Sequence, residues 1–286
     1  MSRRRSEVRR QILRYLLLAG YAVLVLAPVV YMLLISLTSE DQIEFGPLIP
    51  QPPDFSTYIT MWQTVHLALY LRNSLGVSIA SAILATTLAL GGAYVFARFR
   101  FPGRGLFGIS LIAVQTVPTI MLLLPLFIIY VIVQNALGVK IIGSLAGLVI
   151  TYLTFALPFS VWMLSSYFRG LPAELEEAGL VDGCSRTQVL VHIVLPLAVP
   201  AVVVTLIFAF LLAWNEVLFA SVLTNDTTRT LGIGLQGYLA SGEAGGQVYW
   251  NQLMGASLVS SIPAIVLFLG VQRFIVQGLT HGAVRG

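Results

Sequence analysis

The acidic side chains of this chain gather in one short stretch. Four of its 12 Asp and Glu residues lie in ELEEAGLVDG, which separates two long apolar runs. Carboxylates in the first turns of a helix are favoured by the helix dipole, so the glutamates are expected to open a short helix. A solvated connector and a polar surface for another protein both fit this pattern. The residues are Glu174, Glu176, Glu177 and Asp182.

Local signals divide this loop into two helices. Pro172 suits the first turn of a helix, where its missing N–H costs nothing, and 173–180 is predicted as that helix. Gly183 marks a turn, because glycine adopts positive φ without strain. Ser185 and Gln188 have the spacing of a capping box for a second helix, which continues into the next apolar run. The sequence therefore predicts a helix–turn–helix.

Signals for metal or nucleotide chemistry are missing. The three histidines are far apart, and the single cysteine cannot form an internal disulfide or a cysteine-built zinc site. Lys140 is the only lysine, and no G-x-x-x-x-G-K-[ST] loop surrounds it. An intramembrane enzyme would need a motif such as H-E-x-x-H or paired acids at membrane depth. We therefore expect no enzyme activity, bound metal or cofactor on this chain, and energy for any driven process in which it takes part must come from another polypeptide or an ion gradient.

Polar groups inside the apolar runs are candidates for a solute pathway. Glu216 ends a charge-free run, and an ionisable group at membrane depth is costly enough to suggest a function. It equally fits a hydrated or paired acid near the interface, where tryptophans such as Trp214 are common. Amide and aromatic groups together suit a sugar, which offers hydroxyls and an apolar face. The candidates are Gln115, Asn135, Tyr152, Trp214, Asn215 and Glu216.

The composition indicates a membrane protein. Only 10% of the 286 residues are charged, and the mean hydropathy is +0.90. Soluble domains carry about a quarter charged residues. Six intervals free of charged residues are long enough for one crossing each, which takes about 20 residues. The third is expected to form one long helix, kinked near Pro118, plus a turn. The intervals are 15–39, 73–97, 105–139, 141–168, 187–215 and 244–272.

Basic residues set the expected orientation. With the N-terminus in the cytoplasm, 13 of the 16 Lys and Arg residues fall inside and only Arg72, Lys140 and Arg229 fall outside. Six crossings return the C-terminus to the cytoplasm, so the expected fold is an all-α integral membrane protein. Its parts are a basic segment 1–14, the first span and outer loop 15–72, a five-helix core 73–279 containing the loop 169–194, and a tail 280–286.

Several motifs resemble one known family, the binding-protein-dependent ABC importer permeases. The loop is similar to their E-A-A, G, I-x-L-P pattern, and AWNEVLFA and the ending FLGVQRFIVQGLTHGAVRG resemble the carbohydrate, maltose-importer-type branch. The resemblance covers nearly the whole chain. Glycine in place of the usual second alanine is a departure that lowers helix propensity by about 1 kcal/mol. The loop motif consists of Glu177, Ala178, Gly179, Gly183, Ile193, Leu195 and Pro196.

The resemblance implies a fold, a mechanism and partners. The fold would be that of type I ABC importer permeases, in the cytoplasmic membrane of a bacterium or archaeon. The loop would insert its short helix into a separate ATPase, whose nucleotide-driven closure rocks the spans between inward-facing and outward-facing states. Implied partners are a second homologous permease in a heterodimer, two subunits that bind ATP and Mg, an extracytoplasmic sugar-binding protein and membrane lipid, without nucleic acid.

The resemblance also implies two groups of site residues. The ATPase-coupling group is Glu174, Glu176, Glu177, Ala178, Gly179, Asp182, Gly183, Ile193, Leu195 and Pro196. Maltose-type members place a loop that probes the binding protein where this chain has 240–250, the last part of a Gly-rich outer loop, 226–250. The second group is Gly242, Glu243, Gln247, Tyr249 and Trp250. The other outer loop, 40–72, is rich in proline and expected to be irregular.

The expected function is ATP-driven import of a mono- or oligosaccharide delivered by a binding protein. A permease of the same family for glycerol-3-phosphate or a similar polyol ester stays open, because such importers share much of the C-terminal ending. An ion-coupled secondary transporter is a further alternative. It would usually carry buried acids in several spans and an internal repeat, whereas only Glu216 qualifies and no repeat is visible.

Overall fold

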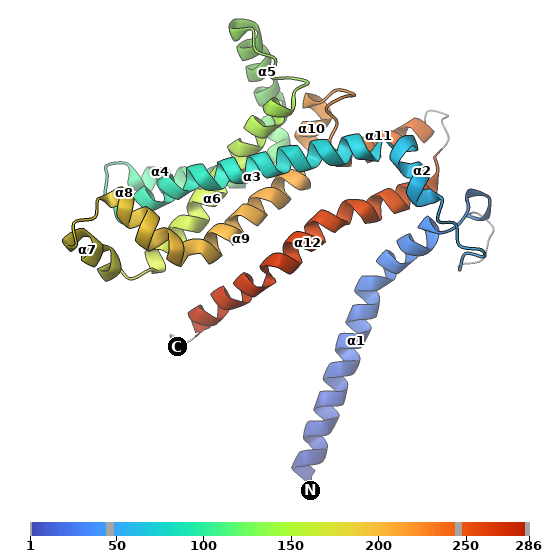
Figure 1. Ribbon diagram of the computed structural model, residues 1–286, viewed down its shortest axis with the longest axis horizontal. Helices are drawn as coiled ribbons and strands as arrows, with labels where there is room; N and C mark the ends of the chain where they lie inside the picture. Colours follow the sequence, from blue (N-terminus) through green and yellow to red (C-terminus); the bar gives the residue numbers. More distant parts are fainter. Residues whose placement is uncertain (1, 44–48, 244–247, 284–286) are drawn as a thin grey trace. The chain divides into compact units, whose positions relative to one another are not determined.

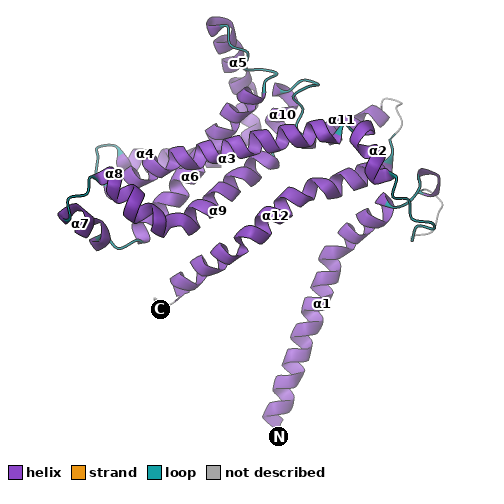
Figure 2. Cartoon of the chain, in the orientation of Figure 1, coloured by secondary structure: helices purple, strands orange, loops and turns teal. Residues whose placement is uncertain are grey.

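The computed structural model describes residues 2–43, 49–243 and 248–283, with side chains for 10–43, 49–240 and 248–272. Every regular element in these ranges is helical, as expected (Figure 2). The elements in Figure 1 are α1 (Ser2–Ser36), α2 (Thr57–Thr64), α3 (Leu67–Arg98), α4 (Arg104–Thr116), α5 (Thr119–Leu137), α6 (Leu145–Gly170), α7 (Glu174–Val181), α8 (Arg186–Val189), α9 (Leu195–Trp214), α10 (Leu218–Leu223), α11 (Leu231–Glu243) and α12 (Trp250–Ala283), with a 3-10 turn η1 (Glu40–Gln42) and a π-helical turn η2 (Leu190–Val194).

Six helical stretches of the described chain are long and apolar enough to cross a membrane. Their number confirms the expectation from the six apolar intervals. Lipid offers no partner for backbone N–H and C=O groups, so a helix satisfies them within each segment. The stretches are Arg10–Ser36, Leu67–Arg98, Thr119–Leu137, Leu145–Gly170, Arg186–Trp214 and Trp250–Gln272.

The third apolar interval does not form the single kinked helix that we expected. α4 ends at Thr116 and α5 begins at Thr119, with Val117 and Pro118 extended between them (ψ 125° and 123°). Proline lacks an N–H and disfavours helical backbone in the residue before it, which explains a break in place of a bend. Of these two helices, α5 alone is long enough to span.

The loops 40–72 and 226–250 both contain helices that their composition did not indicate. The Pro-rich loop 40–72 includes α2, and the Gly-rich loop 226–250 includes α11. Before α2, Asp54 Oδ1 accepts a hydrogen bond from Ser56 N–H at 2.8 Å. The helix itself buries Thr57 and Met61. Most helix stability in proteins comes from such packing, which local composition does not reveal.

The chain divides into two compact units, of which the first comprises Met1–Ala68 and Leu235–Ile262. Its segments meet at the start of α12. Asn251 Nδ2 donates to Thr38 O at 3.1 Å, and Trp250 N–H donates to Glu40 Oε1 at 3.3 Å. Burial raises the pKa of the Glu40 carboxyl, and hydrogen bonds from the Trp250 and Asn251 backbone oppose this in part. The most apolar window of α1 has no buried residue, so this helix presents its side chains to its surroundings.

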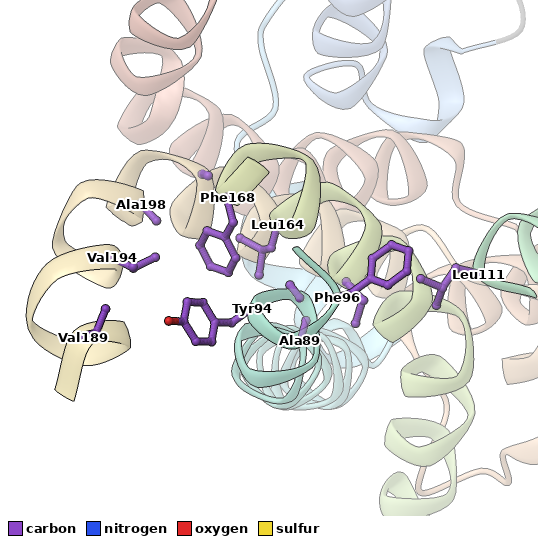
Figure 3. Close-up of a cluster of buried hydrophobic side chains, with 12 residues drawn as sticks. Ala89, Tyr94, Phe96, Leu111, Leu164, Phe168, Val189, Val194 and Ala198 are labelled. Carbon is purple, nitrogen blue, oxygen red and sulfur yellow. The ribbon is translucent and has the colours of Figure 1, made fainter. Parts of the chain in front are cut away.

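The second unit comprises Leu69–Gly234 and Pro263–Gly286. Here α6 packs against α9 and α4. A hydrophobic cluster fills the space between α3, α6 and the start of α9 (Figure 3). Tyr94 and Phe168 meet edge to face in it, 6.4 Å between ring centroids. Val189 and Val194 belong to the same cluster, and Ala89 on α3 lets the helices approach closely.

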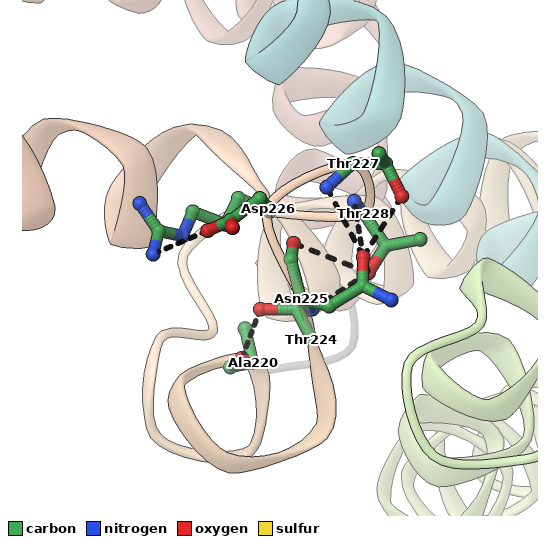
Figure 4. A network of polar contacts seen from close by, with 7 residues as sticks. Ala220, Thr224, Asn225, Asp226, Thr227 and Thr228 are labelled. Carbon is green, nitrogen blue, oxygen red and sulfur yellow. Dashed lines mark hydrogen bonds and ion pairs between the residues drawn. The ribbon is translucent and has the colours of Figure 1, made fainter.

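A polar turn after α10 ties three parts of the second unit together. Asn225 Oδ1 accepts hydrogen bonds from the N–H and hydroxyl groups of Thr227 and Thr228, at 2.8 to 3.2 Å (Figure 4). Asn225 Nδ2 donates to Gly143 O at 3.2 Å, ahead of α6. Asn73 Nδ2 of α3 donates to Thr227 O at 3.0 Å. The turn therefore holds this end of α3 in place.

Candidate functional site

The acidic loop forms the helix–turn–helix that the sequence predicts. α7 begins and ends one residue later than expected, at 174–181 in place of 173–180. Gly183 follows it with a φ of 88°. Cys184 N–H then donates to Gly179 O at 3.0 Å, and Gly183 N–H to Leu180 O at 3.1 Å. This Schellman closure needs a left-handed residue, so a glycine is required at 183. We call α7, the turn and α8 (174–189) the knob.

A capping box and a π-helical turn connect the knob to α9. Ser185 Oγ accepts from Gln188 N–H at 3.3 Å, and Gln188 Oε1 accepts from Ser185 N–H at 2.7 Å, so the predicted box is confirmed. The chain then continues as η2, not as the α-helix we expected. Val189 and Val194 are both buried although they stand five positions apart. An α-helix places that spacing on different faces, and the wider turn brings the two side chains together.

The three glutamates of α7 have different surroundings. Glu176 is buried, with 4% of its surface exposed, whereas Glu174 and Glu177 are exposed. Successive residues of an α-helix point about 100° apart, which turns Glu176 inward and Glu177 outward. Glu176 is therefore not part of the acidic surface that the knob exposes to solvent.

Side chains of α3 bind both carboxylate oxygens of Glu176. Arg98 Nε donates to Oε1 at 2.6 Å, and the Tyr94 hydroxyl donates to Oε2 at 2.9 Å. Arg98 Nη2 also donates to Leu171 O at 3.0 Å, just before α7. Removing one partner of a buried ion pair typically costs about 3–5 kcal/mol, because the other charge is left unpaired. Sequence reasoning missed Arg98 and Tyr94, which lie 78 and 82 positions before Glu176.

Gly179 lies at the closest approach of α7 to η2. It is buried. A Cβ atom added there would collide with Ile193 Cδ1 and lie 3.4 Å from Val189 Cγ2. Ile193 is itself partly buried against the hydrophobic cluster. This close packing gives a physical reason for glycine at 179 that helix propensity alone does not supply.

The exposed side chains of α7 are apolar as well as acidic, and Glu174, Glu177 and Val181 share its outer face. Val181 is 87% exposed and Leu175 is 44% exposed. Glu174 and Glu177 are exposed on the same short helix. Exposed apolar side chains beside charged ones are typical of a surface that binds another protein. Of the other loop residues named above, Ala178, Asp182, Gly183 and Pro196 are exposed, and Ile193 and Leu195 are half-buried.

A cavity of about 560 Å³ lies in the second unit, between α4, α6 and the residues that follow α9. It brings together Gln115, Asn215 and Glu216, three of the six candidates for a solute pathway. Phe155 and Phe159 of α6 also line it. The sequence did not indicate them, because phenylalanine is common in apolar runs. The other lining residues are Val114, Val117, Thr119, Leu212, Val217, Leu218 and Phe219.

Glu216 lines this cavity and also caps α10. Its Oε1 accepts from Phe219 N–H at 2.7 Å, and its Oε2 accepts from Ala220 N–H at 3.1 Å. Backbone N–H groups at the start of a helix stabilise a negative charge, which explains why an acid can follow directly on the apolar run of α9. The neighbouring Asn215 is exposed, and its Nδ2 donates to Leu211 O at 2.9 Å.

The other three candidates do not line the cavity. Trp214 is half-buried and stacks on Phe210, with 5.4 Å between ring centroids. Tyr152 is fully buried in the hydrophobic core, and its hydroxyl lies close to the carboxylate of Glu216, which lines the cavity. Asn135 is exposed near the end of α5. Gln134 beside it accepts from Ile141 N–H at 3.0 Å and so shapes the following turn.

The residues assigned to binding-protein contact are only partly described. Gln247 and the side chain of Glu243 lie outside the described residues, and of Gly242 only the helical backbone is described. Tyr249, the residue before α12, donates its N–H to the Tyr238 hydroxyl at 2.8 Å. Trp250 opens α12 with 45% of its surface exposed.

No three His, Cys, Asp or Glu side chains come together as a metal site among the residues that the structure describes.

Comparison with known proteins adds a family and relatives. The family described as "Binding-protein-dependent transport system inner membrane component" matches residues 89–281. A diacetylchitobiose uptake system permease protein of Streptomyces coelicolor is 32% identical, over 82% of this chain and 77% of the relative. A trehalose/maltose transport system permease protein of Thermococcus litoralis is 34% identical, over 81% and 82%. A chain of a bacterial ABC transporter involved in alginate import has a TM-score of 0.77 at 24% identity, covering 94% and 97%, and shares the fold.

Proposed function

The chain belongs to the family of binding-protein-dependent transport system inner membrane components, and from this premise we propose that it translocates a sugar as one permease subunit of an ATP-driven importer. Such a permease is a multi-pass protein of the cell membrane, and a separate subunit hydrolyses the ATP. The sugar class is supported by relatives whose names specify diacetylchitobiose and trehalose or maltose.

The observation that carries this proposal is the knob. Its outer face, with Glu174, Glu177 and Val181 exposed, fits docking to a soluble ATPase. Its inner face is bound to α3 through Glu176 and packed on η2 at Gly179. We assign the knob and both chain termini to the cytoplasmic side, because 13 of the 16 basic residues then lie inside.

One knob per chain supports an assembly of several subunits. We assign two ATPases, which hold ATP and Mg, and a second homologous permease whose own knob faces the second ATPase. A heterodimer of permeases is our preferred arrangement, and a binding protein delivers the sugar from outside. On the outer side, Tyr249 and Trp250, with Gly242, Glu243 and Gln247, are assigned to contact with that protein.

The cavity supports the assignment of a sugar pathway. Phe155 and Phe159 offer apolar ring surface, while Gln115, Asn215 and Glu216 offer amide and carboxylate groups for hydroxyls. Ligand sites typically combine an apolar wall with a few polar groups in this way. Trp214 and Asn135 do not line this cavity, and Tyr152 is connected to it only through Glu216.

Reconstituted transport tests the proposed function. The complete importer, placed in lipid vesicles with its binding protein outside, is expected to accumulate sugar only when ATP and Mg reach the ATPase side. A control without ATP and with an imposed proton or sodium gradient should give no uptake. Gradient-driven uptake without nucleotide would instead support an ion-coupled transporter, and selective uptake of a glycerol phosphate would overturn the sugar assignment.

Shortening polar side chains in the cavity is expected to slow sugar import. Gln115→Ala and Asn215→Ala each remove hydrogen bonds of about 0.5–1.5 kcal/mol, which corresponds to a loss of roughly twofold to tenfold in rate. Initial uptake rates at saturating binding protein measure this. Asn135→Ala is the matched control, since Asn135 is exposed and does not line the cavity. Equal rates in all three variants would remove the cavity from the pathway.

A further inference from the structure

The cytoplasmic end of α3 binds the knob through charge as well as through packing. Arg98 Nε lies 2.6 Å from Glu176 Oε1, and the two side chains are only 15% and 6% exposed. Tyr94 donates to the second carboxylate oxygen at 2.9 Å. Both oxygens of Glu176 are therefore engaged inside the chain. Of the three glutamates in α7, this one is turned away from a docking partner.

The contact has several attachment points, which restricts sliding of the knob on α3. Arg98 Nη2 donates to Leu171 O at 3.0 Å, so one guanidinium binds both the backbone three residues before α7 and the Glu176 side chain within it. Next to it, the Arg186 guanidinium of α8 lies over the Phe99 ring, 5.7 Å from its centroid. The two hydrogen bonds of Arg98 are charge-assisted, and such bonds are stronger and more directional than those between neutral groups.

The other end of α3 is tied to the outer polar turn. Asn73 Nδ2 donates to Thr227 O and Arg229 O, both at 3.0 Å, and Ser74 Oγ accepts from Leu231 N–H at 2.7 Å. α3 has 32 residues and, at 1.5 Å per residue, is about 48 Å long. A rigid helix held at both ends can carry a displacement of the knob to the far side of this unit.

We propose that Arg98 and Tyr94 are positioning residues of the transport cycle, which fasten the knob to α3 so that movement of the knob moves this helix. The inference rests on the proposed function of the chain as a permease driven through the knob. It assigns Glu176 to this fastening, whereas Glu174 and Glu177 stay on the docking face.

The test measures sugar molecules imported per ATP hydrolysed by the complete importer in vesicles. Arg98→Gln is expected to lower this ratio about fivefold to tenfold, within the range of single residues that modulate coupling. Tyr94→Phe should lower it less, because only one hydrogen bond to Glu176 is lost and the ring keeps its contact with Phe168. Arg98→Lys should fall between the unchanged chain and Arg98→Gln. Arg100→Gln is the matched control, since Arg100 is exposed just beyond α3.

The readout separates coupling from stability. A purely structural role would lower uptake and ATP hydrolysis in the same proportion and leave their ratio unchanged, which would overturn the proposal. If Arg98→Gln does not assemble, Tyr94→Phe and Arg98→Lys decide between these outcomes, and unchanged ratios in both again overturn it. Uptake without ATP by the unchanged importer would be a different result, because it would contradict the proposed function itself.

Discussion

A chain with Gly179→Val is expected to insert into the membrane normally and to import sugar roughly fivefold to 150-fold more slowly. Overpacking a tight contact costs about 1–3 kcal/mol, which corresponds to this range if the knob must leave η2 to make room. A Cβ atom at 179 already meets Ile193 Cδ1, and a valine adds two methyl groups beside Val189. The measurement is ATP-driven uptake by the reconstituted importer, normalised to the amount of assembled complex.

Two further variants make the Gly179 result specific. Gly170→Val is the matched control, because a Cβ at the end of α6 meets no atom within 4 Å. Gly179→Val combined with Ile193→Ala should recover part of the uptake, since the colliding side chain is then removed. Normal import by the single variant would mean that close packing of α7 on η2 is not needed for transport.

Reversing the charge of Glu177 is the second substitution with a large expected effect. Glu177→Lys puts a positive charge in the first turn of α7, where the helix dipole disfavours it by about 0.3–1 kcal/mol. Placing like charges against each other at a protein interface costs several kcal/mol, so ATPase binding is expected to weaken on the order of a hundredfold. Co-purification of the ATPase with the permease and ATP-driven uptake both measure this loss.

The control for Glu177 makes the same charge change elsewhere. Asp226→Lys alters the polar turn after α10, where the Asp226 side chain is 90% exposed and pairs with Arg229. Exposed pairs of this kind contribute about 0–1 kcal/mol, so uptake should hardly change. If Glu177→Lys leaves ATPase binding and uptake intact, the outer face of α7 is not the docking surface.

Hydropathy and local residue chemistry were sufficient to predict much of the fold from the sequence. Six apolar intervals gave six candidate spans, because each must satisfy its backbone within one helix. The capping box at Ser185 and Gln188 followed from spacing alone, since its two hydrogen bonds are local. Proline at 118 indicated that the helix is disturbed there. Whether the helix bends or breaks depended on the backbone conformation of Val117, which the sequence did not reveal.

Contacts between distant segments were beyond the reach of the sequence. Glu176 and Glu177 are adjacent and identical in type, and only the presence of Arg98 and Tyr94 distinguishes the buried one. The cavity likewise required Gln115 to approach Glu216 across the fold. Without the positions of neighbouring helices, a polar residue that lines a cavity cannot be told apart from one that shapes a turn.

The π-helical turn η2 also fixes how far the knob is rotated about the helix axis relative to α9. It accommodates one residue more than an α-helical turn while keeping Val189 and Val194 on one side. Deleting a single residue there would preserve every motif on either side, but would rotate the segment before it by about 100° relative to the span. The number of residues in this junction is therefore constrained more tightly than the identity of its exposed side chains.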